Sequence, residues 1–159
     1  MTQLKGTDRA RTPFWSPDSR HLGFFSFGKL NTIDLVDGEI RSICESNAFH
    51  GAAWHTSDVI VFAPSVTGPL CRVSTSGGTP EAVTPRPSEH SSQLHCWPVF
   101  VPESDDFLFI VNRVGPHDTL RNGLYAASLN SGEVTLVSAE IEGKSRARLV
   151  TFCTGKKPL

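Results

Sequence analysis

Long apolar segments are missing from this 159-residue sequence, and so is a strong excess of charge of either sign. No window approaches the roughly 18 apolar residues that a membrane-spanning helix needs. Residues 1–10 lack the apolar region of a signal peptide. The formal net charge of −1 gives no general attraction to nucleic acid or to an anionic membrane, so we expect neither as a partner. With 38% hydrophobic and 19% charged residues, the composition is still that of a folded globular chain.

Motifs of common catalytic and nucleotide-binding sites are also missing. The sequence holds no G-x-S-x-G nucleophile turn, no G-x-x-x-x-G-K-[ST] or G-x-G-x-x-G phosphate loop, and no H-R-D or D-F-G kinase string. Ser16 and Ser65 lie beside prolines in expected turns, without a supporting His and Asp arrangement. We therefore expect no catalytic residue, no cofactor and no enzymatic activity of this chain.

Cysteines at metal-binding spacing are absent as well, because no C-x-x-C occurs. The four cysteines are widely separated: Cys44, Cys71, Cys96 and Cys153. We interpret them as isolated, mostly buried thiols rather than as a disulfide framework or a zinc site. His90 and His95, followed by Cys96, offer zinc-type donors. Their H-x4-H-C spacing matches no standard site, however, so the sequence predicts no metal.

Regularly spaced tryptophans are the clearest feature that is present. Trp15, Trp54 and Trp97 are 39 and 43 residues apart, and each precedes a polar turn and then an apolar run. Two further short runs, joined by a Gly-containing turn, complete each unit. Four short strands at a period of about 40–45 residues are typical of a β-propeller blade. The sequence therefore predicts an all-β fold, a partial β-propeller of about three four-stranded antiparallel blades.

Two of the predicted strands, at 59–63 and 107–111, are apolar throughout instead of alternating. Such a pattern indicates a strand that is covered on both faces. The inner blades of a propeller meet this condition, because each is sandwiched between two others. A short buried helix is the alternative, but runs of about five residues between turn signals favour strands.

The stretch PFWSPDS at 13–19 carries a resemblance to a known repeat. It resembles the WD40-like repeats of the PD40 and TolB type, in which an aromatic residue and Ser-Pro-Asp-Gly precede an apolar strand, with Ser19 here in place of the Gly. The structural repeat motif comprises Trp15, Ser16, Pro17, Asp18, Trp54, Trp97 and Pro98. We expect the tryptophans to fill the space between blades and Asp18 to order its turn. A role of the aromatic residues in recognition is the alternative.

A closer similarity is to the propeller region at the C-terminus of bacterial serine/threonine protein kinases. It is carried by residues 14–20, 59–65, 68–84 and 95–102. In such parent proteins the propeller lies outside the cytoplasmic membrane, so the resemblance implies an extracytoplasmic or periplasmic location. The sequence itself leaves the compartment open.

The unit boundaries follow from the repeat. We predict blades at 13–47, 48–87 and 88–140, the end of a preceding blade at 1–12, and a basic tail or divergent continuation at 141–159. Because complete propellers have four to eight blades, we expect the chain to be a fragment of a longer protein. Its open blade edges would offer a route to self-association.

The function implied by the resemblance is that of a non-catalytic scaffold for protein–protein interaction or sensing, within a larger, kinase-linked protein. Loops at the two mouths of a propeller provide a broad and rigid binding surface. Two alternatives stay open: an accessory gating propeller of a peptidase or other hydrolase, and a propeller that binds a small molecule or glycan.

Overall fold

The computed structural model describes residues 4–48, 50–86, 92–112, 118 and 120–139. Within this part of the chain all regular structure is β-strand, so the predicted all-β class is confirmed. The same residues contain no helix that is long and apolar enough to cross a membrane.

Three sheets of four strands make up the fold. The first contains β1 (Arg11–Trp15), β2 (His21–Ser26), β3 (Lys29–Asp34) and β4 (Ile40–Glu45). The second contains β5 (Ala52–His55), β6 (Val59–Phe62), β7 (Cys71–Ser74) and β8 (Glu81–Ala82). The third contains β9 (Leu94–Phe100), β10 (Asp106–Asn112), β11 (Gly123–Ser128) and β12 (Val134–Ser138). In each sheet every strand pairs antiparallel with the next one in the sequence.

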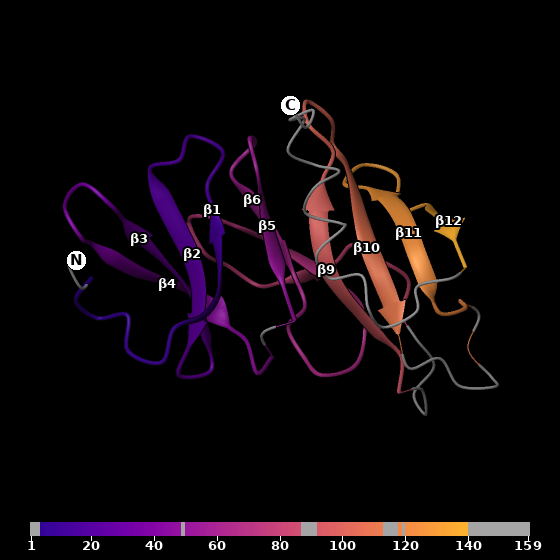
Figure 1. Ribbon diagram of the computed structural model, residues 1–159, viewed down its shortest axis with the longest axis horizontal. Coiled ribbons are helices and arrows are strands. Elements are labelled where there is room, and N and C mark those ends of the chain that lie inside the picture. The colour runs from indigo at the N-terminus through magenta and orange to yellow at the C-terminus, as the bar shows by residue number, and fades with distance from the viewer. Residues whose placement is uncertain (1–3, 49, 87–91, 113–117, 119, 140–159) are drawn as a thin grey trace, which may run out of the picture.

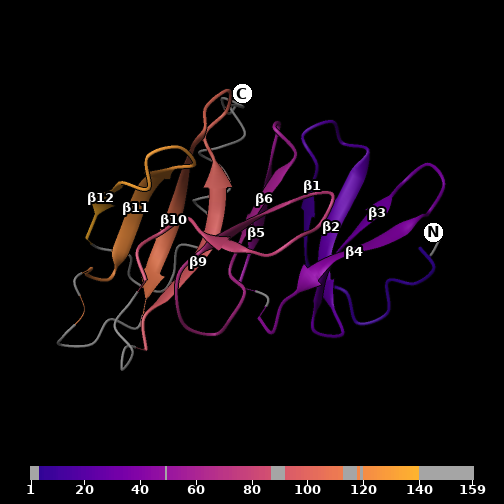
Figure 2. The ribbon, with the colours of Figure 1, turned by 180° about the vertical axis from the view of Figure 1, so that it is seen from behind.

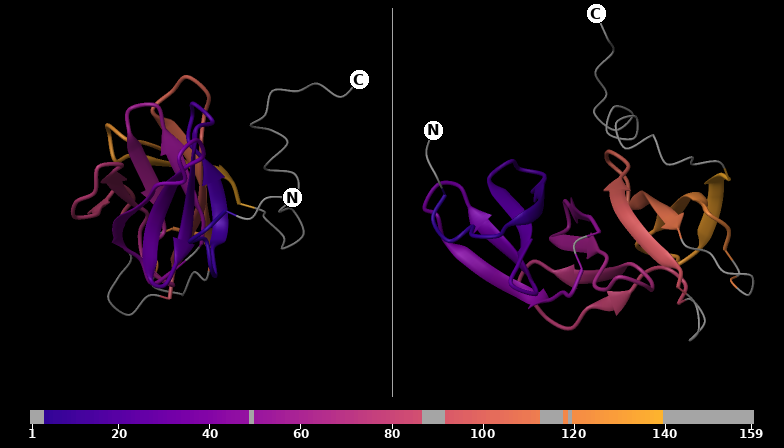
Figure 3. Two further views of the ribbon diagram at one scale, coloured as in Figure 1. Left: turned by 90° about the vertical axis from the view of Figure 1, so that its left-hand side faces the viewer. Right: turned by 60° about the horizontal axis from the view of Figure 1, so that its bottom comes forward.

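The three sheets are arranged as neighbouring blades along an arc (Figures 1 and 3). Contacts between sheets are concentrated at their first strands, with β1 against β5 and β5 against β9. The first and third sheets lie toward opposite ends of the molecule in Figures 1 and 2, with the middle sheet between them. This radial order is the arrangement of blades in part of a β-propeller, as the sequence predicts.

Strand β6 shows why the middle blade needs an unbroken apolar run. Ile60 and Phe62 pack into a cluster with Phe25 and Leu30 of the first sheet. Val61, between them, points to the opposite face and joins the cluster with the third sheet. All three β6 side chains are fully buried. The expectation that both faces of this strand are covered is therefore confirmed.

Strand β10 fits the same expectation on one face only. Phe107, Phe109 and Val111 are fully buried against the middle sheet. Leu108 and Ile110 alternate with them and are half-buried. In the described residues no fourth sheet lies against that outer face. The run at 107–111 thus has the composition of a strand covered on both faces but receives a neighbouring sheet on one.

The first sheet begins at Arg11, within the segment 1–12 that was predicted to end a preceding blade. Residues 4–10 form turns rather than a strand. Gly6 and Arg9 both have positive φ, and Thr7 bonds back to the Leu4 carbonyl through its hydroxyl. These turns prevent the extended backbone that a strand requires. The predicted tail at 141–159 lies outside the described residues.

Cys71 and Cys96 are buried free thiols, and Cys44 is half-buried. Burial raises the pKa of Cys44 to about 11 and also raises that of Cys71. The raised pKa makes the thiols of Cys44 and Cys71 less reactive, because the thiolate is the reactive form. Cys153 lies outside the described residues.

Candidate functional site: two grooves on the face of the first turns

The turn after the first strand of each sheet lies on one common face of the molecule. These three turns are 16–20, 56–58 and 101–105. Each contains one non-glycine residue in the left-handed region, with φ of 59° at Ser19, 58° at Asp58 and 59° at Glu103. Ser19 therefore has the backbone conformation that the glycine of the Ser-Pro-Asp-Gly pattern would adopt without strain.

Hydrogen bonds hold the first of these turns rigidly. The Ser16 hydroxyl donates to Asp18 Oδ1 over 2.5 Å and accepts the backbone N–H of His21 over 2.8 Å. Asp18 Oδ1 also accepts the backbone N–H of Arg20 over 3.0 Å. The Ser16 hydroxyl, followed by the Arg20 N–H, holds the pKa of the Asp18 carboxyl below its usual value. Asp18 thus orders this turn as an acceptor within it.

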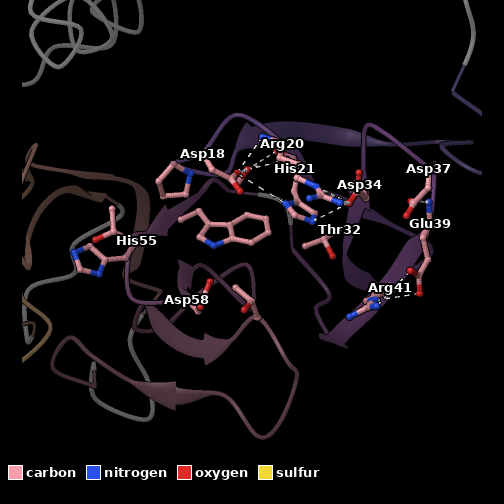
Figure 4. A pocket seen from close by; sticks show the side chains of 15 residues that line it. Asp18, Arg20, His21, Thr32, Asp34, Asp37, Glu39, Arg41, His55 and Asp58 are labelled. Atoms are coloured by element: carbon pink, nitrogen blue, oxygen red, sulfur yellow. Dashed lines mark hydrogen bonds and ion pairs between the residues drawn. The ribbon is translucent and has the colours of Figure 1, made fainter.

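A groove of about 760 Å³ opens between the first and second sheets on this face (Figure 4). On its first-sheet wall, the Arg20 guanidinium binds Asp34 Oδ2 at 2.8 Å, and the His21 ring lies 3.5 Å from the same oxygen. The Val36 N–H donates to the other Asp34 oxygen over 2.7 Å. The Val36 N–H, and then Arg20, lower the pKa of Asp34. A second pair, Arg41 and Glu39, lies further out at 3.1 Å.

Trp54 also lines this first groove. Its ring is 6.4 Å from Phe14 and 5.8 Å from His21 of the first sheet, measured between ring centroids. Phe14 in turn covers Gly23, where an added Cβ would come within 2.0 Å of the ring. A glycine at this point lets the Phe14 ring lie directly against the backbone of β2.

A second groove of about 530 Å³ continues from the first and is lined by the first turns of all three sheets. The two grooves share residues of the turns, including Ser16, Trp54 and Thr56. Trp15 and Phe100 line the second groove together with Trp54. The result is a single recessed path that crosses all three blades.

His55 closes the floor between the grooves. Its Nδ1 accepts from the Ser57 hydroxyl at 2.7 Å, and its Nε2 lies 3.3 Å from the Ser104 carbonyl and 3.4 Å from Asp105 Oδ1. The ring also stacks on Phe100 at a centroid distance of 4.7 Å. The structure thus brings a Ser, a His and an Asp together. Nδ1 is engaged by the turn 56–58 and Nε2 by the turn 101–105, so the ring links the two turns.

The tryptophans do not share one role. Trp54 packs between two sheets as expected, but Trp15 is 58% exposed, so its predicted role as a filler between blades is wrong. Register explains the difference, because Phe14 pairs with Gly23 and faces the second sheet, while Trp15 pairs with Leu22 on the opposite face. Trp97 is half-buried, with φ of 54°, and packs closely on Gly51.

The remaining motif residues have structural positions. Pro17 lies in the turn 16–20 and lines both grooves, and Pro98 is buried within β9. His95 is fully buried and bonded through both ring nitrogens to Thr84 and Gln93. No group of three or more metal-ligating side chains occurs in the part of the chain that the structure describes. His90 lies outside it.

Comparison with known proteins identifies the fold. No family model and no curated protein matches the sequence. Among solved structures, a protein described as TolB from Agrobacterium tumefaciens matches with a TM-score of 0.59 and 17% identity over 81% of this chain. TolB from Acinetobacter baumannii matches with a TM-score of 0.61 and 18% identity over 80% of this chain.

The fold is that of a TolB-type β-propeller. A puromycin-hydrolyzing peptidase of Mycobacterium tuberculosis is also similar, with a TM-score of 0.59 and 13% identity over 84% of this chain. The chain spans only 46%, 31% and 25% of the lengths of these three proteins, in the order given. The three sheets therefore correspond to part of each of these proteins, and in the two TolB structures to part of a TolB-type propeller.

Sequence reasoning identified the turn 16–20 but missed the grooves. Arg20 and Asp34 are 14 positions apart, and His55 and Asp105 are 50 apart. No local spacing signals that they meet. The one available hint was the clustering of polar and charged residues in each turn that follows a tryptophan.

Proposed function

We propose that this chain is a non-catalytic propeller module that binds a protein partner on the face of its first turns. The observation that carries the proposal is the recessed path formed by the two grooves across three blades. Its walls are turns held by internal hydrogen bonds and ion pairs. A preformed surface of this kind loses little conformational entropy on binding, which favours recognition.

The chemistry of the path supports binding rather than turnover. Asp34 and Glu39 are neutralised by Arg20 and Arg41, and the two nitrogens of His55 are engaged by Ser57 and Ser104. These groups are already committed to holding the path together. In our proposal they shape a surface and do not exchange protons with a substrate.

We further propose, from the sequence resemblance, that the module is part of a kinase-linked protein and functions in sensing outside the cytoplasmic membrane. The alternative as an accessory propeller of a peptidase draws on the similarity to the M. tuberculosis peptidase, which concerns the fold alone. The domain encoded next to this segment in the gene distinguishes the two, because a kinase domain supports the first and a hydrolase domain the second.

The experiment for the main proposal is selection of random 12-residue peptides on the full chain, followed by binding measurements on variants. Thr56 is exposed and lines both grooves. We expect Thr56→Tyr to block the path and to lower the affinity of the selected peptides at least about tenfold, which is the effect of losing one interface contact. Thr135→Tyr, on the exposed edge strand β12, is the matched control and should bind normally. Peptides that bind both variants equally would show that the path is not the interface.

A further inference from the structure

The charge of the two grooves differs from that of the chain. Seven carboxylates and two arginines line them, a net charge of −5 with neutral histidines, whereas the whole chain carries −1. The negative charge is therefore gathered on the face of the first turns. We infer that the grooves bind an extended, basic segment of a partner protein, rich in Lys or Arg. This inference rests on the proposed function and specifies the partner's chemistry.

Ion pairing within the grooves leaves most of these carboxylates uncompensated. Arg20 and Arg41 each neutralise one acid, Asp34 and Glu39 respectively. The remaining five have no Lys or Arg within ion-pair distance among the described residues: Asp18, Asp37, Asp58, Glu103 and Asp105. Clefts lined by one sign of charge concentrate the field, so this face attracts cations and repels phosphate groups. A nucleic acid is thus disfavoured as the ligand.

Aromatic rings lie among these carboxylates. Trp54 is half-buried and lines both grooves, while Phe14 and His21 hold its ring from the first-sheet side. Trp15 lines the second groove and is largely exposed. A Lys or Arg side chain over an indole gains a cation–π attraction, which is greatest for Trp among the aromatic residues. Carboxylates and indoles together favour a basic side chain with a long apolar stem over a simple inorganic cation.

The shape of the path favours an extended segment. The grooves are continuous through Ser16, Trp54 and Thr56 and run across three neighbouring blades. Uncompensated carboxylates occur along this whole length, from Asp37 in the β3–β4 turn to Asp105 in the β9–β10 turn. Several basic side chains, spaced along one strand-like peptide, would be needed to neutralise them. Such an arrangement accelerates association and makes it sensitive to salt.

The test uses the full chain and fluorescein-labelled 12-residue peptides of three kinds: alternating Arg and Ser, alternating Glu and Ser, and a neutral Gly-Ser sequence. We expect only the Arg peptide to bind, with affinity falling about fivefold or more between 50 and 300 mM salt because of screening. The double variant Asp58→Asn and Glu103→Gln should weaken it about tenfold. Asn tolerates the left-handed conformation at position 58, and Glu103→Gln preserves side-chain size. Circular dichroism verifies that the variant folds.

The double variant Asp8→Asn and Glu45→Gln is the matched control, because both residues are exposed, neither lines a groove, and the charge change is identical. An equal loss of affinity for the Arg peptide in both double variants, or no loss of affinity in either, overturns the inference. No binding of the Arg peptide overturns it as well. If the Glu or neutral peptide binds more tightly than the Arg peptide, the inferred basic segment is overturned, but the proposed scaffold function is supported. Binding of a glycan such as maltoheptaose, with no peptide bound, overturns both.

Discussion

The buried histidine between the second and third sheets gives a quantitative prediction. His95 is fully buried in β9. Its Nδ1 lies 2.7 Å from the Thr84 hydroxyl, and its Nε2 lies 2.9 Å from Gln93 Oε1. The Thr84 oxygen also accepts the Leu70 N–H over 2.9 Å, so its own proton is free to donate to Nδ1. Every partner is therefore satisfied by a neutral ring that carries its proton on Nε2.

Protonation of this ring disrupts the network. A second proton on Nδ1 would leave the Thr84 hydroxyl proton without its acceptor, and a positive charge would be buried. Burial lowers the pKa of His95 from 6.5 to about 4, and the weaker attraction of Asp118 acts in the opposite direction. On acidification, the folded protein thus protonates His95 about 2.5 pH units below the pH at which the unfolded chain does, which is the difference between these two pKa values.

The sign of the effect follows from linkage. Between pH 6.5 and about pH 4, His95 is protonated in the unfolded state but neutral in the folded state. The free energy of unfolding therefore falls as the pH falls through this range. Above pH 6.5 His95 is neutral in both states, and this loss of stability is absent. At 1.36 kcal/mol per pKa unit, the loss between pH 7.5 and pH 4.5 is about 2–3 kcal/mol. This is a large part of the stability of a chain of this size.

The assay is urea unfolding followed by tryptophan fluorescence, for the wild type and for His95→Gln, between pH 7.5 and pH 4.5. We expect the variant to be less stable at pH 7.5, and the difference between the two proteins to shrink by about 2–3 kcal/mol at pH 4.5. Contributions from Asp18 and Asp34, whose pKa values are lowered, are common to both proteins and cancel.

Nitrogen chemical shifts of the His95 ring provide a measurement that does not depend on the variant folding. They should report the neutral Nε2–H form down to about pH 5. A ring that titrates between pH 6 and 7, or a stability difference that stays constant with pH, would refute the reasoning.

Three further predictions concern packing, backbone strain and thiol reactivity. Phe62→Ala should cost about 3–5 kcal/mol in urea unfolding because a fully buried ring between two sheets is lost, whereas Phe62→Leu should cost clearly less; equal costs would contradict a packing role. Ser19→Gly should raise the free energy of unfolding by about 0.5–1 kcal/mol by relieving positive φ, and Ser19→Ala should bring no such gain; a gain in both would exclude the backbone explanation. Cys44, with its raised pKa, should react with iodoacetamide at pH 8 far more slowly in the native protein than in 8 M urea, as read by peptide mass spectrometry; equal rates would refute its burial.

Local patterns were sufficient for most of the architecture. The run at 59–63 reads as a strand covered on both faces, and the structure places Ile60 and Val61 in two different interfaces. Ser-Pro-Asp at 16–18 reads as a turn, and it is one. Both signals depend on neighbouring residues only, on strand periodicity and on turn-forming side chains.

The roles of individual side chains were less predictable. Trp15 and Trp54 occupy equivalent places in the repeat, yet one is largely exposed and the other packs between sheets. The sequence could not distinguish them, since a strand places successive side chains on opposite faces, and the face that is covered depends on the neighbouring blade.

The sequence by itself determined that this chain is a series of four-stranded antiparallel units joined by tight turns, because strand pairing here is between consecutive segments. Only the tertiary structure decided what those units make together. The pairing of Arg20 with Asp34, the contact of His55 with Asp105, and the acidic grooves arise where turns from separate blades meet. Charge–charge and side-chain contacts act through space, so their partners are fixed by the stacking of blades rather than by distance along the chain.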